Sequence, residues 1–210
     1  MRLSDAHVLM TEPLKGEDAK WTRLILTTFK DPLGTQRTWE HAERQTRPKS
    51  SSVDGVGIVA VLNLPSGPEL VLQRQYRPPV NAVCIEIPAG LVDEGETPEQ
   101  AALRELKEET GYIGEISMST SVMLNGTTSY SHPGFCNTNL KMIHMTIDIN
   151  RPENQNPQPE LEENEFIEVF TLPLKDLYSH CEKWEKEGYA LDARVATLAE
   201  GIEMAKRWGL

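Results

Sequence analysis

Residues 90–112 read GLVDEGETPEQAALRELKEETGY, and this stretch decides the fold because it crowds glutamates onto one short helix behind a glycine loop. The spacing is ordered: five residues separate Gly90 from Glu96, and seven separate Glu96 from Arg104. The remaining fixed positions are Glu105, Leu106, Glu108, Glu109, Gly111 and an aromatic Tyr112. A solvated acidic helix would explain the charge of this stretch, but it would not explain the ordered glycines and the arginine.

Local signals predict where this helix begins and ends. Thr97 supplies a hydroxyl N-cap, Pro98 suits the first helical position, and Gln100 closes a capping box. The helix is predicted to run to about residue 110, where Gly111 ends it, because glycine adopts a left-handed conformation at low steric cost. The expected buried stripe is Ala102, Leu103 and Leu106, with the glutamates on the opposite side.

The glutamates of this helix predict a metal site. Glu105 and Glu109 are four residues apart and Glu108 is three from Glu105, so the three share one side. Carboxylates gathered in this way repel one another unless a cation or an arginine offsets their charge. Arg104 precedes Glu108 by four residues and is expected to pair within the cluster. Because Mg²⁺ accepts hard oxygen ligands and keeps water for a phosphate, the predicted chemistry is hydrolysis of a diphosphate.

The composition of the chain limits the kinds of partner and compartment that we expect for it. The chain has 210 residues, 39% of them hydrophobic, and no apolar run of membrane-spanning length. Its 21 basic and 32 acidic residues give a net charge of −11, which argues against a nucleic-acid partner. The first twenty residues lack both a secretory apolar stretch and a basic targeting composition, so we expect a cytoplasmic protein, with the nucleus as a second compartment, and no membrane partner.

The chain is expected to divide into two units. Residues 21–30 and 36–44 flank a Pro-Gly turn and predict a hairpin in an N-terminal unit, residues 1–48. A polar, proline-containing linker, residues 45–52, leads into the catalytic domain, residues 49–210. Strands are predicted over residues 56–62, 69–76, 83–87, 115–124, 138–148 and 165–171, followed by two helices, the last over about 191–207.

The acidic stretch resembles the Nudix box at every fixed position, and the likeness extends over most of the chain. The segments RTWEHAER (37–44), DGVGIVAVL (54–62), QYRPP (75–79), EIPAG (86–90) and LDARV (191–195) are similar to those of ADP-ribose and ADP-sugar pyrophosphatases. The resemblance implies an α+β fold, an α/β/α Nudix sandwich with a mixed sheet plus a small N-terminal antiparallel β unit. It also implies a homodimer in which the N-terminal unit exchanges between subunits.

The resemblance implies the metal ligands and the catalytic groups. Glu105 and Glu109 would bind Mg²⁺ first, with Glu108, then Glu96, and the Ala89 carbonyl as further ligands. Mn²⁺ is a possible substitute. Arg104 and Glu108 also count among the catalytic residues, and Glu165 matches the general base. Two neighbouring glutamates, Glu162 and Glu163, are alternatives for that base.

The resemblance also implies the substrate contacts. Trp21 and Trp39 would stack on an adenine, with Glu40 beside it, and Arg44 and Arg77 would lie near the diphosphate. The alternative for the tryptophans is a hydrophobic contact in the hairpin or at a dimer interface, and for Arg77 a surface salt bridge.

The implied activity is hydrolysis of ADP-ribose to AMP and ribose 5-phosphate. Another ADP-sugar or a dinucleotide is the main alternative substrate, because the adenine and diphosphate contacts read only the half that these compounds share. A non-catalytic ADP-ribose sensor is the other alternative, although no ligand glutamate is missing here. One departure from the family is an apparent inserted loop near residues 125–130, ahead of Pro133-Gly134.

Overall fold

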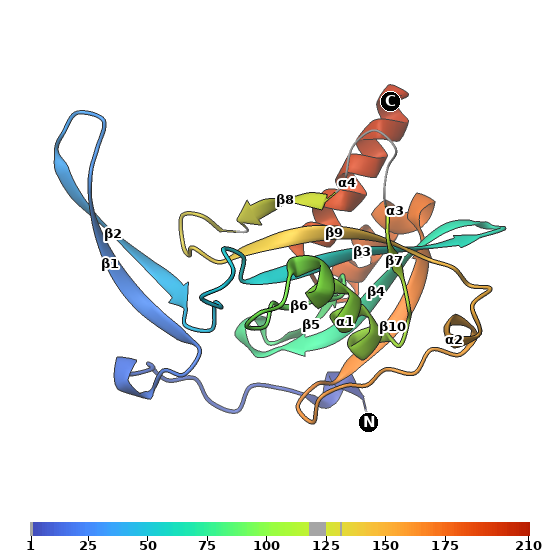
Figure 1. The fold of residues 1–210 in the computed structure, drawn as a ribbon, viewed down its shortest axis with the longest axis horizontal. Helices are drawn as coiled ribbons and strands as arrows, with labels where there is room; N and C mark the ends of the chain where they lie inside the picture. The colour runs from blue at the N-terminus through green and yellow to red at the C-terminus, as the bar shows by residue number, and fades with distance from the viewer. Residues whose placement is uncertain (1, 118–124, 131) are drawn as a thin grey trace.

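The computed structural model describes residues 2–117, 125–130 and 132–210. Two strands, β1 (Thr22–Lys30) and β2 (Gln36–Arg44), form an antiparallel hairpin that projects away from the rest of the molecule (Figure 1). The predicted N-terminal hairpin is therefore confirmed. Its tip is tied by Asp31, whose side chain accepts hydrogen bonds from the backbone N–H groups of Leu33 and Thr35.

A mixed sheet forms the centre of the body. In the described part of the chain nine strands belong to it: β3 (Gly55–Leu64), β4 (Gly67–Arg77), β5 (Ala82–Glu86), β6 (Ala89–Leu91), β7 (Glu115–Ile116), β8 (Asn125–Tyr130), β9 (Asn139–Ile147), β10 (Ile167–Pro173) and β11 (Ala190–Leu191). The main order is β11-β5-β4-β3-β9-β7. The pairs β3–β9 and β11–β5 are parallel, and the other pairs are antiparallel.

Helices cover both faces of this sheet. Helix α1 (Pro98–Thr110) lies on one face, and α3 (Leu177–Lys186) and α4 (Ala193–Trp208) lie on the other. The alternation of β3 explains the two cores, since Val56 and Ile58 pack with α1 while Val59 packs with α3 and α4. The α/β/α sandwich with a mixed sheet is confirmed. The short elements are α2 (Pro152–Gln155) and the 3₁₀ turns η1 (Leu3–Asp5), η2 (Gly16–Asp18), η3 (Pro78–Val80) and η4 (Leu174–Asp176).

Helix α1 has the predicted ends. The Thr97 side chain accepts from the Gln100 backbone N–H, and the Gln100 side chain accepts from the Thr97 N–H, which completes the capping box. Gly111 ends the helix with φ 74°, and a Cβ there would lie 2.3 Å from the backbone nitrogen of Gln158. Both the conformation and the close contact therefore require glycine at this position.

The predicted buried face of α1 was partly wrong. Leu103 is 42% exposed, whereas Ala101 is fully buried beside Ala102 and Leu106. Glu109 is buried as well, at 4% exposure, so the glutamates do not all lie on the solvent side. The helix is rotated so that residues 101, 102, 106 and 109 face the sheet. Tertiary packing fixes this rotation, which the helical period alone does not determine.

Two other expectations changed. Within the strand expected over residues 115–124, β7 covers Glu115–Ile116, and residues 118–124 lie outside the described residues. Residues 125–130, expected to be an inserted loop, form β8 and pair with β9. The expected linker is also fastened to the body, because Lys49 N–H donates to Glu94 and Ser50 Oγ accepts from Gly95 N–H.

The N-terminus returns to the body. In η1 the Leu3 side chain is buried, and this turn contacts β4 and β5. Residues 1–48 thus include a segment that packs on the sheet as well as the projecting hairpin. Among the helices that the structure describes, none has the length and apolar character needed to cross a membrane.

Candidate active site

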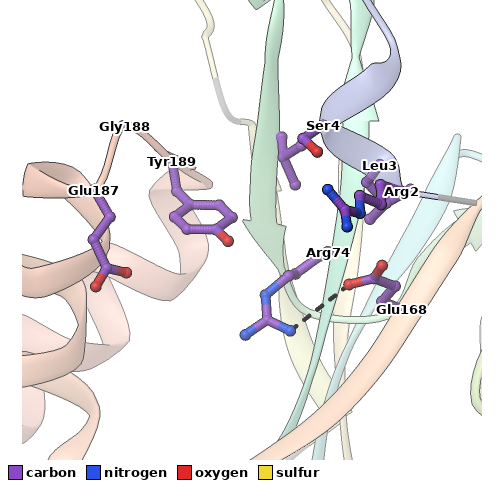
Figure 2. A pocket seen from close by; sticks show the side chains of 9 residues that line it. Arg2, Leu3, Ser4, Arg74, Glu168, Glu187, Gly188 and Tyr189 are labelled. Carbon is purple, nitrogen blue, oxygen red and sulfur yellow. Dashed lines mark ion pairs between the residues drawn. The ribbon is translucent and has the colours of Figure 1, made fainter.

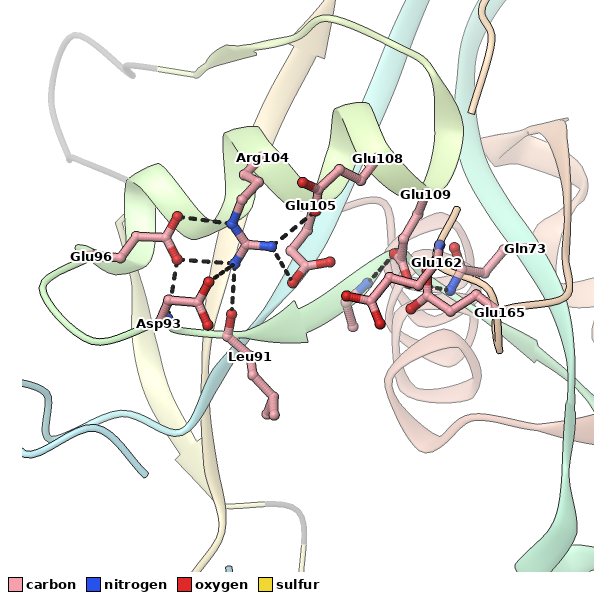
Figure 3. A network of polar contacts seen from close by, with 11 residues as sticks. Gln73, Leu91, Asp93, Glu96, Arg104, Glu105, Glu108, Glu109, Glu162 and Glu165 are labelled. Carbon is pink, nitrogen blue, oxygen red and sulfur yellow. Dashed lines mark hydrogen bonds and ion pairs between the residues drawn. The ribbon is translucent and has the colours of Figure 1, made fainter. Parts of the chain in front are cut away.

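Arg104 lies at the centre of the acidic stretch. Its Nε and Nη2 each donate to a Glu96 oxygen at 3.0 Å, and its Nη1 donates to Glu105 at 2.8 Å and to Glu108 at 3.0 Å (Figure 3). A fifth hydrogen bond, from Nη2, reaches the carbonyl of Leu91 at 3.0 Å. The hydrogen bonds from Arg104 hold the pKa of Glu96 below its ordinary value. Arg104 therefore pairs with Glu108 as predicted, and also ties the helix to the loop before it.

Glu109 has the opposite environment. Its carboxylate accepts from the Ala89 backbone N–H at 2.9 Å and from Gln73 Nε2 at 3.4 Å, and it makes no ion pair with any residue that the structure describes. Burial, reinforced by the negative charges of Glu105 and Glu165, raises the pKa of Glu109 to about 8. Burial also raises the pKa of Glu105. With no ion-pair partner among the described residues, the buried Glu109 carboxyl favours its protonated form at neutral pH, and a bound cation would favour its ionised form.

The backbone before the helix approaches these carboxylates closely. A Cβ on Gly90 would lie 1.9 Å from the Glu105 carboxyl carbon, far inside van der Waals contact. Gly90 belongs to β6, which pairs with β3 through Gly57 and Ala89. The glycine therefore lets β6 and the helix face each other across a gap that a side chain would fill.

The donor set suits a hard divalent cation. Oxygen ligands are offered by Ala89 in β6, by Glu96 in the loop that follows, and by Glu105, Glu108 and Glu109 in α1. Across residues 2–117, 125–130 and 132–210, no three acidic, histidine or cysteine side chains are yet grouped as a metal-binding set. Arg104 forms ion pairs with three of these glutamates, Glu96, Glu105 and Glu108. The unneutralised Glu109 and the unpartnered Gln73 Oε1 beside it are the observations that fit a cation with bound water.

The loop before β10 brings further carboxylates to this end of the cluster. Glu162 and Glu165 lie beside Glu109 in Figure 3. Glu165 Oε2 accepts from the Glu162 backbone N–H at 3.1 Å, and Glu165 is half-buried while Glu162 and Glu163 are exposed. Since the charge of Glu165 raises the pKa of both Glu105 and Glu109, the geometry favours Glu165 over its two neighbours as the group that faces the cluster.

Arg77 is the last residue of β4, and the alternation of the strand puts its side chain on the same sheet face as Gln73. It forms a two-pronged ion pair with Glu86, with N–O distances of 2.6 and 2.7 Å, and these hydrogen bonds raise the pKa of Arg77. The alternative expected for Arg77, a salt bridge, is thus present, with the buried Glu86 as its partner. A diphosphate would have to share Arg77 with Glu86.

In the part of the chain that the structure describes, the four predicted residues of the hairpin make no hydrogen bond or ion pair with the acidic cluster. Trp21 precedes β1, and Trp39, Glu40 and Arg44 lie on β2, which projects from the body (Figure 1). Trp39 donates from Nε1 to the Gly134 carbonyl at 2.9 Å and lines a mainly apolar hollow of about 360 Å³ with Pro133 and Cys136. One subunit therefore does not place both tryptophans at the acidic cluster.

A second hollow, on the other side of the sheet, lacks these features. It is lined by residues that include Arg2, Arg74, Glu168 and Tyr189 (Figure 2). Arg74 lies over the Phe170 ring at 4.3 Å, and its nearest carboxylate, on Glu168, is 3.8 Å away. No glutamate of the acidic stretch lines this hollow, so the candidate active site remains between β6 and the second half of α1, which carries Glu105, Glu108 and Glu109.

Sequence reasoning missed one polar residue of the site, Gln73. It is fully buried on β4, where Val71, two residues earlier on the same sheet face, packs in the apolar core under α1. The available signal was the alternation of the strand, which places Gln73 at an inward position that an apolar residue usually occupies.

Comparison with known proteins agrees with this geometry. The NUDIX domain family matches residues 52–194, a range that contains the acidic cluster, Arg77 and Glu165. An ADP-ribose pyrophosphatase of Saccharomyces cerevisiae is 46% identical over 207 residues, which cover 97% of this chain and 87% of that protein. An ADP-sugar pyrophosphatase of Mus musculus is 38% identical over 192 residues, which cover 90% of this chain and 84% of that protein.

A solved structure of an ADP compounds hydrolase has the same fold. It superposes with a TM-score of 0.60 at 19% identity, and the match covers 91% of this chain and 90% of that one. This likeness concerns the fold alone.

Proposed function

This chain belongs to the Nudix family and is a Nudix hydrolase, and we propose that it uses Mg²⁺ to hydrolyse ADP-ribose to AMP and ribose 5-phosphate. The observation that carries the proposal is the complete acidic cluster, in which Glu109 is buried without a counter-charge beside Glu105 and Glu165. The names of the yeast and mouse relatives support ADP-ribose or another ADP-sugar as the substrate class. Residues 49–210 are the proposed catalytic unit.

The proposed metal ligands are the carboxylates of Glu105, Glu109, Glu108 and Glu96 and the carbonyl of Ala89. Bound Mg²⁺, or Mn²⁺ in its place, would neutralise charge on the diphosphate and lower the pKa of a bound water. Arg104 orients Glu96, Glu105 and Glu108 through four hydrogen bonds, and a fifth anchors it to the Leu91 carbonyl. Gly90 keeps the approach to Glu105 open.

Glu165 is the proposed general base. A water oxygen bonds to one phosphorus of the diphosphate, the bond from that phosphorus to the bridging oxygen breaks, and the departing phosphate takes the bond electrons. The proton of the water passes to the carboxylate of Glu165, whose Oε2 is fixed by the Glu162 N–H. Arg77, already aligned by Glu86, donates to the phosphate oxygens and orients them.

The hairpin is the proposed adenine-binding and dimerisation element. Trp21 and Trp39 are 66% and 53% exposed. Trp39 pairs with Thr27, so six residue steps of about 3.3 Å separate the two indoles along the hairpin, roughly 20 Å in all. One adenine cannot stack on both tryptophans of the same chain.

We therefore propose a homodimer in which Trp21 and Trp39 at each site come from different subunits, with Glu40 beside the adenine and Arg44 toward the diphosphate. The exposure of Leu24, at 87%, and of Leu26, at 63%, supports a partner surface on the hairpin.

The test is turnover of ADP-ribose, ADP-glucose, NADH and diadenosine polyphosphates with Mg²⁺ and then with EDTA, following AMP and phosphosugar release. Preference for ADP-ribose that EDTA abolishes is the expected result. Faster cleavage of another compound would overturn the substrate assignment but keep the chemistry. Tight binding of ADP-ribose without turnover would overturn the enzymatic proposal in favour of a sensor.

A further inference from the structure

Gln73 is a buried polar residue under the catalytic helix. It lies on β4 directly opposite Glu86 of β5, and its side chain is on the α1 face of the sheet. Its neighbour Arg74 points to the opposite face, toward Phe170. Burying an amide costs free energy unless both of its polar atoms are hydrogen-bonded, so a fully buried glutamine here needs a physical reason.

One half of the Gln73 amide has a partner. Nε2 donates to Glu109 Oε1 at 3.4 Å, while the other carboxylate oxygen of Glu109 accepts from the Ala89 N–H at 2.9 Å. The carboxylate is thus held from two strands, β4 and β6, and both donors are neutral. Arg104 orients Glu96 with a positive charge, which competes with a cation, whereas Gln73 orients Glu109 and leaves its negative charge available.

The oxygen of the Gln73 amide has no hydrogen-bond partner in the described part of the chain. This Oε1 atom is also buried. With Glu109 ionised, as a metal ligand must be, reversing the amide would place its oxygen against a carboxylate oxygen, so the orientation with Nε2 toward Glu109 is the favourable one for metal binding. An unpaired buried acceptor costs about 1–3 kcal/mol, which marks this position as one that is completed by something further.

We infer that Gln73 is a positioning residue for the metal site: its Nε2 fixes Glu109 as a ligand, and its Oε1 accepts a hydrogen bond from a water bound to the cation. The inference rests on the proposed function, because it needs Glu109 to bind Mg²⁺. Groups that orient metal ligands typically change metal affinity about 10- to 100-fold when they are removed.

The experiment compares Gln73→Met with Val71→Ala. Methionine keeps the length of glutamine and removes both polar atoms, and Val71 is an equally buried residue of the same strand face. Isothermal titration with Mg²⁺ alone gives the affinity without turnover. We expect the Gln73→Met dissociation constant to rise about 10- to 100-fold, and the Mg²⁺-dependent rise in Tm to become smaller at the concentration that saturates the unmodified protein.

Kinetics separate positioning from packing. In Gln73→Met the Mg²⁺ concentration for half-maximal rate should rise while KM for ADP-ribose at saturating Mg²⁺ stays the same. Val71→Ala should lower Tm and leave Mg²⁺ affinity unchanged. If Gln73→Met does not fold, Gln73→Asn keeps the amide but withdraws it from Glu109, and it should weaken Mg²⁺ binding in the same direction.

Unchanged Mg²⁺ affinity in a folded Gln73 variant would overturn the inference. Failure of the unmodified protein to bind Mg²⁺, or turnover that EDTA does not affect, would instead overturn the proposed function. The two failures are therefore distinguishable.

Discussion

The carboxylate of Glu105 occupies the space in which a side chain on Gly90 would begin. A Cβ on Gly90 would lie 1.9 Å from the Glu105 carboxyl carbon and from one carboxylate oxygen. A side chain at position 90 would therefore displace the Glu105 carboxylate, and the proposed metal site depends on where that carboxylate lies.

Gly90→Ala tests this dependence. The methyl group must push Glu105 away, and because a misplacement of about 1 Å can cost roughly 100-fold in rate, we expect kcat to fall by about that factor. The control is Gly201→Ala in α4, where a Cβ meets nothing within 4 Å. That variant should keep full activity and gain about 0.5–1 kcal/mol of stability. Unchanged kcat in Gly90→Ala would contradict the close approach.

The raised pKa of Glu109 predicts that the stability of the metal-free protein depends on pH. Burial raises the pKa of Glu109 to about 8 from an ordinary value of 4.5, so the folded state favours the protonated carboxyl. The folded protein therefore loses stability as pH rises from about 4.5 through 8, because ionising Glu109 costs more free energy in the folded state than in the unfolded state.

Glu109→Gln should remove that dependence. In EDTA, Tm should fall between pH 6 and pH 9 more steeply for the unmodified protein than for Glu109→Gln, by on the order of 5 °C. The two proteins share every other ionisable group, so the difference between the two curves is the readout. Mg²⁺ should raise the Tm of the unmodified protein at pH 9 and have little effect on the variant. Parallel curves would rule out the buried, uncompensated carboxylate.

How much of this site was predictable depends on the distance over which each contact acts. The ends of α1 were predicted because Thr97 and Gln100 bond to each other locally, and Gly111 acts on its own residue. The rotation of α1 about its own axis was not predicted. It decides whether Ala101 or Leu103 faces the sheet, and that sheet is built from strands distant in the sequence.

The remaining differences have the same origin. Residues 125–130 contain glycine and hydroxyl residues typical of a loop, yet they form β8 because β9 supplies the hydrogen-bond partners. Gln73 and Glu109 are 36 residues apart, and nothing local to VLQRQ indicates that a carboxylate lies above it. The box residues were predicted as a set because one helix and one loop carry them.

Arg104→Lys should behave as a damaging substitution. Lysine keeps the charge but cannot reproduce the planar fork that reaches Glu96, Glu105, Glu108 and the Leu91 carbonyl. We expect kcat/KM to fall about 10- to 100-fold. Arg151→Lys is the matched control, because Arg151 makes one exposed contact of 3.4 Å with Glu115. Equal activity of the two variants would show that charge alone is needed at position 104.

The composite adenine site makes the sharpest prediction about the hairpin. Base–aromatic stacking is worth about 1–3 kcal/mol, so Trp21→Ala and Trp39→Ala should each raise KM for ADP-ribose roughly 5- to 150-fold. If each site takes Trp21 from one subunit and Trp39 from the other, a mixed dimer of the two variants has one site with neither tryptophan and one site with both. Unfolding and refolding an equal mixture should then restore about a quarter of the sites. Kinetics at low ADP-ribose measure that recovery, with each variant refolded alone as the control. No recovery in a mixture that size-exclusion chromatography shows to be dimeric would mean that Trp21 of one subunit and Trp39 of the other do not complete one site, whereas a monomer at all concentrations would reject the dimer itself.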